Sequence, residues 1–255
     1  LIGYHHQVRD TIGNIPVMVT YCTVCRTGRV FSPKVGDKLE DFRLVGMDHF
    51  NAMFEDATTK SWWQQATGEA VAGPLKGTRL HEIPAQQVSL SAWLNQYPNS
   101  LVMQPDTMFN KQYDHLADFD RGTIKSGLEK RDSASWQFKS WVVGIDNGQH
   151  AKAYDWNELV NKKIIQDSMP DLPLVILLES DTTSFHVYKR SVNGIPLHFV
   201  PDSTGTFLKD VNTQTLWNIH GNCVEGPLKG QQLLKVKASQ EFWHSWQQFH
   251  PNTSR

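Results

Sequence analysis

Long apolar runs, an excess of charge of either sign and an even set of cysteines are all missing from this chain. Its 255 residues hold 25 lysines and arginines against 26 aspartates and glutamates, for a net charge of −1. This balance gives no electrostatic basis for binding nucleic acid. No apolar run approaches the roughly 18 residues of a membrane-spanning helix, so we expect no transmembrane segment. Three cysteines cannot all be paired, and the fold is not expected to depend on crosslinks.

Several catalytic signatures are absent as well. The chain has no Gly-x-Ser-x-Gly elbow, no Gly-x-x-x-x-Gly-Lys-Ser/Thr phosphate loop and no His-Glu-x-x-His or His-x-x-x-His pair. A serine hydrolase or a P-loop nucleotide site therefore has no support. Hydrophobic residues make up 39% and charged residues 20%, which is typical of a globular protein with one large domain or two small ones.

What the chain does contain is an internal repeat. The pentapeptide Gly-Pro-Leu-Lys-Gly occurs unchanged at residues 73–77 and 226–230, and the same offset places Trp93 on Trp246. Nearer the start of each copy, the stretch RDTIGNIPVMVTYC aligns with QDSMPDLPLVILLE. Matches of this extent indicate a tandem duplication. A repeat has to be recognised first, because overlooking it leads to a wrong prediction of the fold.

Each half follows the same order of elements: apolar strands separated by turns, a tryptophan segment, the glycine loop and one short helix. The helices are predicted in SLSAWLNQY and SQEFWHSWQQF, each starting at a serine suited to N-capping. The pattern predicts a mainly β (α+β) fold of two tandem duplicated β-rich units with short helices, related by a pseudo-two-fold axis. The predicted strands cover residues 17–21, 29–31, 39–44, 174–178, 185–188 and 197–200.

The repeat also sets the expected boundaries. We assign residues 1–103 to the first repeat, 104–139 to a polar connecting segment and 140–255 to the second repeat. The second repeat opens with a predicted hairpin (141–145 and 151–154, with a turn at Asn147-Gly148) and a helix from 156 to 160. The first copy lacks these elements, so we expect the protein to continue before Leu1 and to form the matching hairpin there.

The two copies differ most in chemistry around a Cys-x-x-Cys pair. Cys22 and Cys25 end an apolar run in the first copy, whereas the second copy has Glu179 and a turn without thiols at the aligned positions. His5 and His6, which precede that run, likewise align with lysines. Thiolate and imidazole together suit zinc, copper or iron. We therefore predict that Cys22 and Cys25, with His6 or His5, bind one transition-metal ion.

Other interpretations of the pair remain open. It could form a redox disulfide, or two inert thiols in the core. A thioredoxin-type site would place its first cysteine at a helix N-terminus, whereas a β-type run follows here. His49, close to Asp48, could supply another ligand or a general base, although a solvated loop explains it as well. Cys223 aligns with Ala70, as expected for a small buried residue.

Three stretches carry a resemblance to a known family. They are residues 21–25 (Tyr-Cys-Thr-Val-Cys), 62–65 (Trp-Trp-Gln-Gln) and 68–77 (Gly-Glu-Ala-Val-Ala-Gly-Pro-Leu-Lys-Gly). They resemble the Tyr-Cys-Pro-x-Cys-Gly, Leu-Trp-x-Gln and Gly-Pro-Leu-x-Gly signatures of a widespread prokaryotic domain family of unknown function. Here Thr23 stands in place of the family's Pro and Arg26 in place of its Gly. The resemblance implies an exported, often lipid-anchored protein.

Together these observations predict an extracytoplasmic metal-binding protein with a redox or metal-handling role and a Cys/His site in the first repeat. The alternative is a non-catalytic secreted or assembly protein, whose tryptophans and connecting segment contact a protein partner or a second copy of the chain. The expected location is periplasmic or extracellular, with anchoring through a segment before Leu1.

Overall fold

The computed structural model describes residues 2–114, 116, 118–203 and 207–255, so Leu1 and His115 lie outside the described residues. The chain forms two compact units, each assembled from separate segments. Unit 1 comprises Leu1–Ala85, Leu101–Gly144 and Ser239–Thr253, and unit 2 comprises Gln86–Ser100, Ile145–Ala238 and Ser254–Arg255. The predicted repeat boundaries are continuous along the sequence, whereas these units are not.

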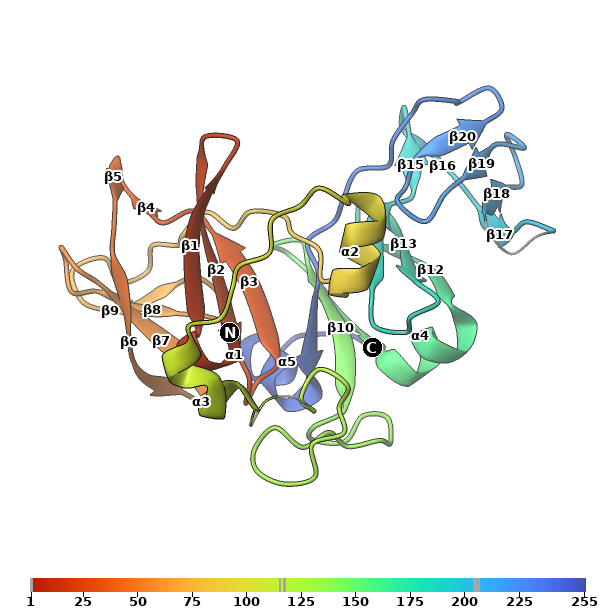
Figure 1. The fold of residues 1–255 in the computed structure, drawn as a ribbon. Coiled ribbons are helices and arrows are strands. Elements are labelled where there is room, and N and C mark those ends of the chain that lie inside the picture. Colours follow the sequence, from red (N-terminus) through yellow and green to blue (C-terminus); the bar gives the residue numbers. More distant parts are fainter. Residues whose placement is uncertain (1, 115, 117, 204–206) are drawn as a thin grey trace. The chain divides into compact units, whose positions relative to one another are not determined.

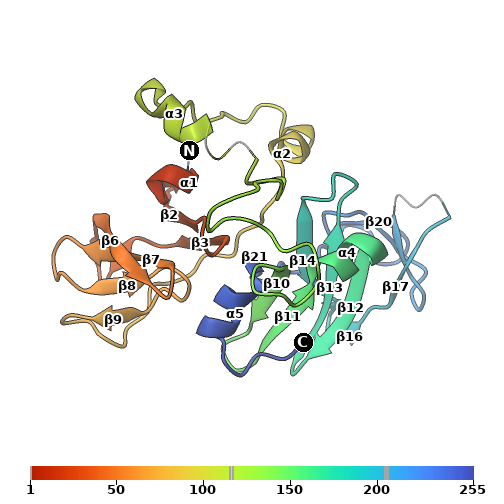
Figure 2. The ribbon, with the colours of Figure 1, turned by 90° about the horizontal axis from the view of Figure 1, so that it is seen from below.

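Unit 1 is built on antiparallel β-structure (Figures 1 and 2). One sheet has the order β1-β2-β3, another β6-β7-β8-β9, β4 pairs with β5, and β10 pairs with β21. The strands are β1 Gln7–Ile12, β2 Ile15–Cys22, β3 Thr27–Phe31, β4 Lys34–Val35, β5 Lys38–Leu39, β6 Phe42–Asp48, β7 Asn51–Asp56, β8 Trp62–Gln64, β9 Ala70–Ala72, β10 Trp141–Asp146 (its last two residues in unit 2) and β21 Ser239–Phe242. The helices are α1 Ile2–His5, the 3₁₀-helix η1 Thr107–Phe109, α3 Asn110–Asp114 and α5 Trp243–Phe249.

Unit 2 contains the sheets β12-β13-β14 and β17-β18-β19-β20 and the pair β15-β16. Helix α4 packs beside β13 (Figures 1 and 2). The strands are β11 Ala151–Asp155, β12 Ile164–Met169, β13 Leu172–Leu178, β14 Phe185–Lys189, β15 Ser191–Val192, β16 Ile195–Pro196, β17 Phe199–Pro201, β18 Leu208–Asp210, β19 Leu216–Trp217 and β20 Cys223–Glu225. The helices are α2 Leu90–Gln96 and α4 Trp156–Lys162.

The predicted mainly β fold is confirmed, and so are two of the predicted helix starts. Ser89 caps α2 by accepting a hydrogen bond from the Ala92 N–H at 3.1 Å, and Asp155 caps α4 through the Glu158 N–H at 3.0 Å. These caps satisfy backbone donors that the first turn of a helix leaves free.

The prediction that the last helix begins at Ser239 is wrong. Residues Ser239–Phe242 form strand β21 instead, and α5 begins only at Trp243 without a side-chain cap. All four residues of β21 are buried and pair with β10, and Glu241 also binds Arg29 through an ion pair of 2.8 Å. Tertiary pairing therefore overrides the local capping signal.

Each unit has its own apolar core. The core of unit 1 includes Met18, Cys22, Cys25, Phe31, Phe42, Phe54, Trp63, Ala70 and Leu80. The core of unit 2 includes Val175, Leu177, Tyr188, Val192, Phe199, Trp217, Cys223 and Leu233. Cys223 is 3% exposed, which confirms the small buried residue that the sequence predicts.

The first position of each Gly-Pro-Leu-Lys-Gly loop requires glycine for two reasons, its backbone conformation and the closeness of neighbouring atoms. Gly73 and Gly226 have φ angles of 90° and 94°, a region that favours glycine. A Cβ atom on Gly73 would lie 2.6 Å from the Ser61 Cα, and one on Gly226 would lie 2.9 Å from the Thr215 Cγ2. The loop is thus explained by packing, as the sequence suggests.

Among the helices of the described ranges, none combines the length and the apolar character needed to cross a membrane.

Candidate functional site

The two thiols of the Cys-x-x-Cys pair come together in the core of unit 1. Cys22 is the last residue of β2 and pairs with Thr27, the first residue of β3. Between them the chain turns tightly, and the Arg26 N–H donates to the Thr23 carbonyl at 3.2 Å. Cys22 is 2% exposed and Cys25 is fully buried, while the Cys25 carbonyl accepts a hydrogen bond from the Phe242 N–H of β21 at 3.0 Å. Both cysteines are free thiols.

The two thiols differ sharply in acidity. A hydrogen bond from the Cys25 thiol lowers the pKa of Cys22 to about 7, aided by the backbone N–H groups of Cys25, Ala52 and Val24 and opposed by burial. The same hydrogen bond, followed by burial, raises the pKa of Cys25 far above its usual range. Cys22 is therefore substantially ionised near neutral pH while Cys25 keeps its proton. A thiolate is the form that binds metals and attacks electrophiles.

Cys22, but not Cys25, lines a pocket of about 570 Å³ within unit 1. Its wall also contains His6, whose imidazole can bind a metal, and Met47, whose thioether sulfur is a soft donor. Met47 is 64% exposed, so this part of the pocket wall is open to solvent, and the unbranched methionine side chain can adapt its shape there. The remaining lining residues are Gly3, Tyr4, Thr23, Val24, Leu44, Ala52, Lys111, Gln112, Leu116 and Glu129.

The two predicted histidine ligands lie in different surroundings. His6 shares the pocket with Cys22, and its Nδ1 lies 3.0 Å from the Tyr21 carbonyl oxygen. His5 is exposed and its Nε2 lies 2.8 Å from the Tyr113 hydroxyl, beside the ring of Phe109. His5 is not among the residues that line the pocket. The structure thus brings His6, rather than His5, to the same cavity as Cys22.

Two further basic side chains reach the Val24 carbonyl, inside the Cys-x-x-Cys turn. Lys139 donates to that carbonyl at 2.7 Å, and burial lowers the pKa of its ammonium. His244, from α5, also hydrogen-bonds there, but burial lowers its pKa to about 4. Its Nε2 is buried with no hydrogen-bond partner among the described residues. Neither residue could be predicted here from the sequence, because both come from segments far from Cys22 along the chain.

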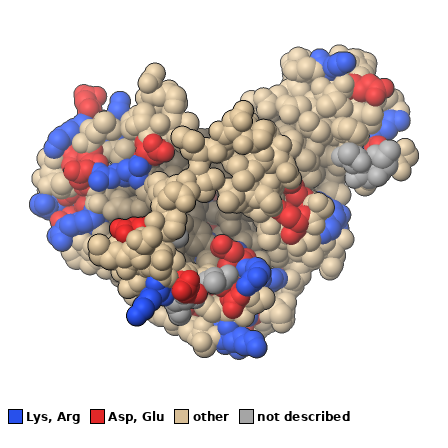
Figure 3. Space-filling view, viewed as in Figure 1, with Lys and Arg blue, Asp and Glu red and all other residues tan. Residues whose placement is uncertain are grey.

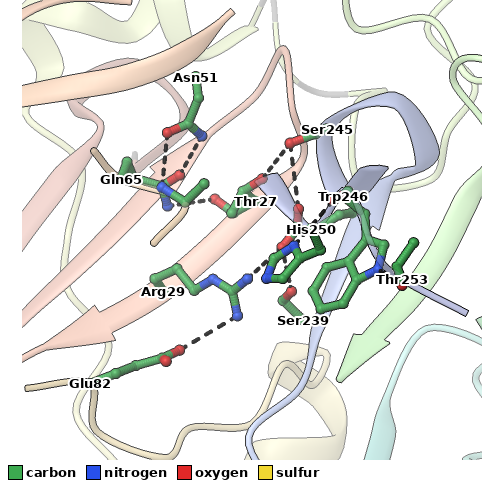
Figure 4. Close-up of polar contacts among 12 residues, drawn as sticks. Thr27, Arg29, Asn51, Gln65, Glu82, Ser239, Ser245, Trp246, His250 and Thr253 are labelled. Carbon is green, nitrogen blue, oxygen red and sulfur yellow. Dashed lines mark hydrogen bonds and ion pairs between the residues drawn. The ribbon is translucent and has the colours of Figure 1, made fainter. Parts of the chain in front are cut away.

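A chain of polar contacts begins at Cys25, whose sulfur is hydrogen-bonded to the Ser245 hydroxyl. Figure 4 shows Ser245 beside Thr27, and the two hydroxyl oxygens are 3.4 Å apart. The Ser245 hydroxyl also donates to a Glu241 carboxylate oxygen at 3.4 Å, and the other oxygen of that carboxylate accepts from Arg29 at 2.8 Å. This buried ion pair connects the thiol site to strand β21, and its partners are aligned by hydrogen bonds as a buried charge requires.

A second cluster of metal-type ligands occurs in unit 2, where the sequence did not predict one. One ligand atom each from Glu179, His186 and His220 all lie within 4.8 Å of one another, and no other such group of three exists among the described residues. Burial lowers the pKa of His186, and the opposing hydrogen bond that His186 donates to Glu179 raises it. The available signal was the sequence alignment of Glu179 with Cys22, because each of these ligand-type side chains stands at or just after the end of an apolar strand.

The remaining polar candidate, His49, lies in an exposed turn. Its side chain is 60% exposed and its Nδ1 is 2.6 Å from the Asp48 carboxylate. This position agrees with the solvated loop that the sequence allowed. On the face drawn in Figure 3, basic and acidic side chains are interspersed rather than gathered by sign, as expected from the net charge of −1.

The comparisons with known proteins define the class to which this chain belongs. A family model described as Protein of unknown function (DUF3179) matches residues 1–253, so the chain is a member of that family. No curated protein and no solved structure matched the chain. The resemblance expected from the Cys-x-x-Cys and Gly-Pro-Leu-Lys-Gly segments is thereby confirmed at the level of the family.

Proposed function

We propose that this protein binds a soft transition-metal ion through Cys22 and Cys25, with His6 moving in as a third ligand, since the ligand atoms of these three residues do not all lie within 4.8 Å of one another. The observation that carries the proposal is the pairing of the two thiols: they are in hydrogen-bond contact, and the pKa of Cys22 is about 7. Cysteine ligands must be deprotonated before they bind metal, and a pKa of about 7 leaves about half of Cys22 deprotonated at neutral pH. The ion would displace the proton of Cys25, whose thiol now donates to Cys22.

The donors around the pocket favour a particular kind of ion. The Cys22 sulfur, the Met47 thioether and the His6 imidazole line the pocket, and the Cys25 thiol hydrogen-bonds to Cys22 from behind that wall. All four are soft or borderline donors, a set that selects copper(I) over harder cations. Zinc and iron remain alternatives with the same thiolates. Among the described residues that line the pocket, Glu129 is the one carboxylate, so a single anionic oxygen ligand is on offer there.

The proposal is tested by anaerobic titration with copper(I) against a competing copper(I) chelator. We expect Cys22→Ser and Cys25→Ser each to abolish tight binding and His6→Ala to weaken it. His5→Ala is the matched control, because His5 is the neighbouring imidazole but points to Tyr113. If the Cys22→Ser/Cys25→Ser double variant retains the wild-type affinity while remaining folded, the site does not exist.

A thiol redox function is the second candidate, and the unequal acidity of the two thiols favours it. The Cys22 thiolate would attack a disulfide, releasing one of its sulfurs as a thiolate. Cys25 would then lose its proton and attack Cys22, so that the partner gains two electrons and Cys22–Cys25 becomes a disulfide. Equilibration with glutathione buffers tests this alternative: a reversible two-electron midpoint with no copper binding would favour it over the metal site.

We also propose that the two halves arose by duplication, and matched packing supports this. Trp63 lies edge-on to Phe42 with centroids 6.3 Å apart, and Trp217 lies edge-on to Phe199 at 6.0 Å. A Cβ on Gly68 would meet the Phe31 ring, and one on Gly221 would meet the Tyr188 ring. In the sequence alignment each of these residues falls on its counterpart. Under this proposal, unit 1 keeps the thiol site that the second copy lacks.

An extracytoplasmic location remains a proposal as well, supported by the character of the family that the sequence resembles. Fusion of the native gene product to a periplasmic reporter enzyme, with cell fractionation, tests it. The connecting segment and the residues just before it offer a surface for a protein partner or a second copy, because Leu101 is 99% exposed and Met108 is 79% exposed. Loss of an observed association in Leu101→Ser would support that role.

A further inference from the structure

The Glu179, His186 and His220 cluster of unit 2 is held in place by its own supporting contacts. Glu179 follows the end of β13, and its Oε1 lies 2.6 Å from Nε2 of His186 on β14. His186 is 2% exposed, and its ring lies parallel to Tyr188 at 6.1 Å. On the other side of the His186 ring, Gln86 Nε2 lies 3.0 Å from Nδ1. The imidazole is therefore fixed by contacts at both nitrogens.

His220 approaches from a turn that is itself well ordered by hydrogen bonds. The Asn218 side-chain oxygen accepts from the N–H groups of His220 and Asn222 at 3.1 and 3.0 Å, and the Asn218 carbonyl accepts from Gly221 at 3.0 Å. Gly221 has a φ of 77°, which closes the turn. The His220 ring stands edge-on to His186 with centroids 5.6 Å apart. Both imidazoles therefore face the same small volume beside the Glu179 carboxylate.

We propose that unit 2 binds one divalent transition-metal ion through Glu179, His186 and His220. Two imidazoles and one carboxylate, with no thiol, form a ligand set that zinc, iron(II) and related ions accept and that leaves positions open for water or substrate. Ligand atoms bound to one such ion at about 2.0–2.2 Å are about 3.0–3.5 Å apart. The present spread of up to 4.8 Å is closed by a movement of about 1.5 Å, roughly a side-chain rotation.

Metal binding would change which nitrogen of the His186 ring carries the proton. With Gln86 donating to Nδ1, the neutral ring carries its proton on Nε2 and donates it to Glu179. A metal ion at Nε2 takes the place of that proton, and the ring then carries its proton on Nδ1. The Gln86 amide turns its carbonyl oxygen toward Nδ1–H, which is the supporting hydrogen bond that metal-binding histidines usually make. Gln86 is thus a positioning residue, one that touches the ligand and not the ion.

This site is chemically distinct from the thiol pair of unit 1. The cysteines are absent here, since Glu179 occupies the position that aligns with Cys22. A carboxylate and two imidazoles prefer borderline divalent ions, whereas two thiols prefer softer ones. The inference therefore does not rest on the proposed function, and either site can exist without the other.

Cobalt(II) provides the test, because its absorption spectrum distinguishes ligand types. The full-length Cys22→Ser/Cys25→Ser variant, which lacks the thiol site, is titrated with cobalt(II) and then with zinc in metal-free buffer. We expect one equivalent to bind with visible d–d absorption and without the thiolate-to-cobalt charge-transfer band. Glu179→Gln and His220→Ala should each weaken binding at least tenfold, and Gln86→Ala should weaken it about 10- to 100-fold.

His198→Ala is the matched control, because His198 is an exposed histidine of the same unit. It should leave the affinity unchanged. Glu179 and His220 are only partly buried, so their variants are expected to fold, which the circular dichroism of each would verify. The proposal is overturned if the cysteine-free protein binds no cobalt or zinc, if folded Glu179→Gln and His220→Ala bind as tightly as their parent, or if His198→Ala lowers the affinity equally.

Discussion

The Arg26 guanidinium lies over the ring of Trp141, 3.9 Å from its centroid, although Arg26 itself has a left-handed backbone with φ of 57°. This is the position at which the related signature has glycine, the residue that adopts such a backbone at least cost. The arginine compensates through buried contacts: it donates to Gln240 at 2.8 Å and to the carbonyls of Phe119 and Asp120 at 3.2 Å. A strained turn beside the thiols is thereby tied to the core.

Substitution of Arg26 separates these two effects. Arg26→Ala keeps the strained φ and loses the guanidinium contacts, so we expect a loss of about 3 kcal/mol in the free energy of unfolding. Arg26→Gly loses the same contacts but relieves the strain, so it should be about 1 kcal/mol more stable than the alanine variant. Chemical denaturation of both variants measures the difference. An alanine variant as stable as the glycine variant would show that the turn is not strained.

The acidity of Cys22 predicts pH-dependent alkylation. In protein with reduced thiols, the rate of Cys22 modification by iodoacetamide should rise with pH around a midpoint near 7. Cys25→Ala removes the main hydrogen-bond donor to the Cys22 sulfur, so the midpoint should move toward the ordinary cysteine value of about 8.5. Mass spectrometry of the modified peptide follows the reaction, with Cys223→Ser as a control that should change nothing. A midpoint unaffected by Cys25→Ala would contradict the described hydrogen bond.

The low pKa of His244 predicts that the free energy of unfolding decreases in acid. Its folded pKa of about 4 is below the ordinary value of about 6.5, so between these pH values the unfolded chain binds a proton that the folded chain does not. Stability should therefore rise with pH from about 4 to 6.5 and then level off for this group. His244→Phe should remove up to about 3 kcal/mol of that slope. Denaturant midpoints across this range test it, with the exposed His198→Phe as the reference; identical slopes would exclude the effect.

We expect replacement of Asp56 in unit 1 and of Asp210 in unit 2 to lower the stability of the protein by similar amounts. Asp56 accepts from Thr59 Oγ1 at 2.6 Å, the Ser61 N–H at 3.1 Å and the Trp63 indole at 3.0 Å. Asp210 accepts from the N–H groups of His198 at 2.6 Å and Thr213 at 2.7 Å.

Both carboxylates are fully buried, so replacement by alanine leaves several donors unsatisfied. We expect Asp56→Ala and Asp210→Ala each to cost about 2–4 kcal/mol. Thermal unfolding of the two variants, compared with the exposed Asp37→Ala, measures the cost. A large loss from only one of them would argue against the proposed duplication.

Much of the local structure could be predicted from residue patterns. Apolar runs bounded by turns predicted β2, β13 and β14, and the Asn147-Gly148 turn predicted the β10–β11 region, since these signals depend on neighbouring residues alone. The start of α5 could not be predicted, because burial of β21 against β10 outweighs the local preference for a helix. In the site, the sequence predicted the meeting of Cys22 and Cys25, whose spacing closes a turn.

By itself, the sequence determined the mainly β class, the family and the thiol pair, because each follows from short-range spacing or from self-similarity along the chain. Only the tertiary structure decided which histidine shares a pocket with Cys22, that Cys25 lowers the pKa of Cys22, and that Glu179, His186 and His220 converge. The physical reason is that burial, hydrogen-bond direction and ligand distance depend on atoms from strands and turns that are far apart in the sequence. No local sequence pattern shows which of these segments will come into contact.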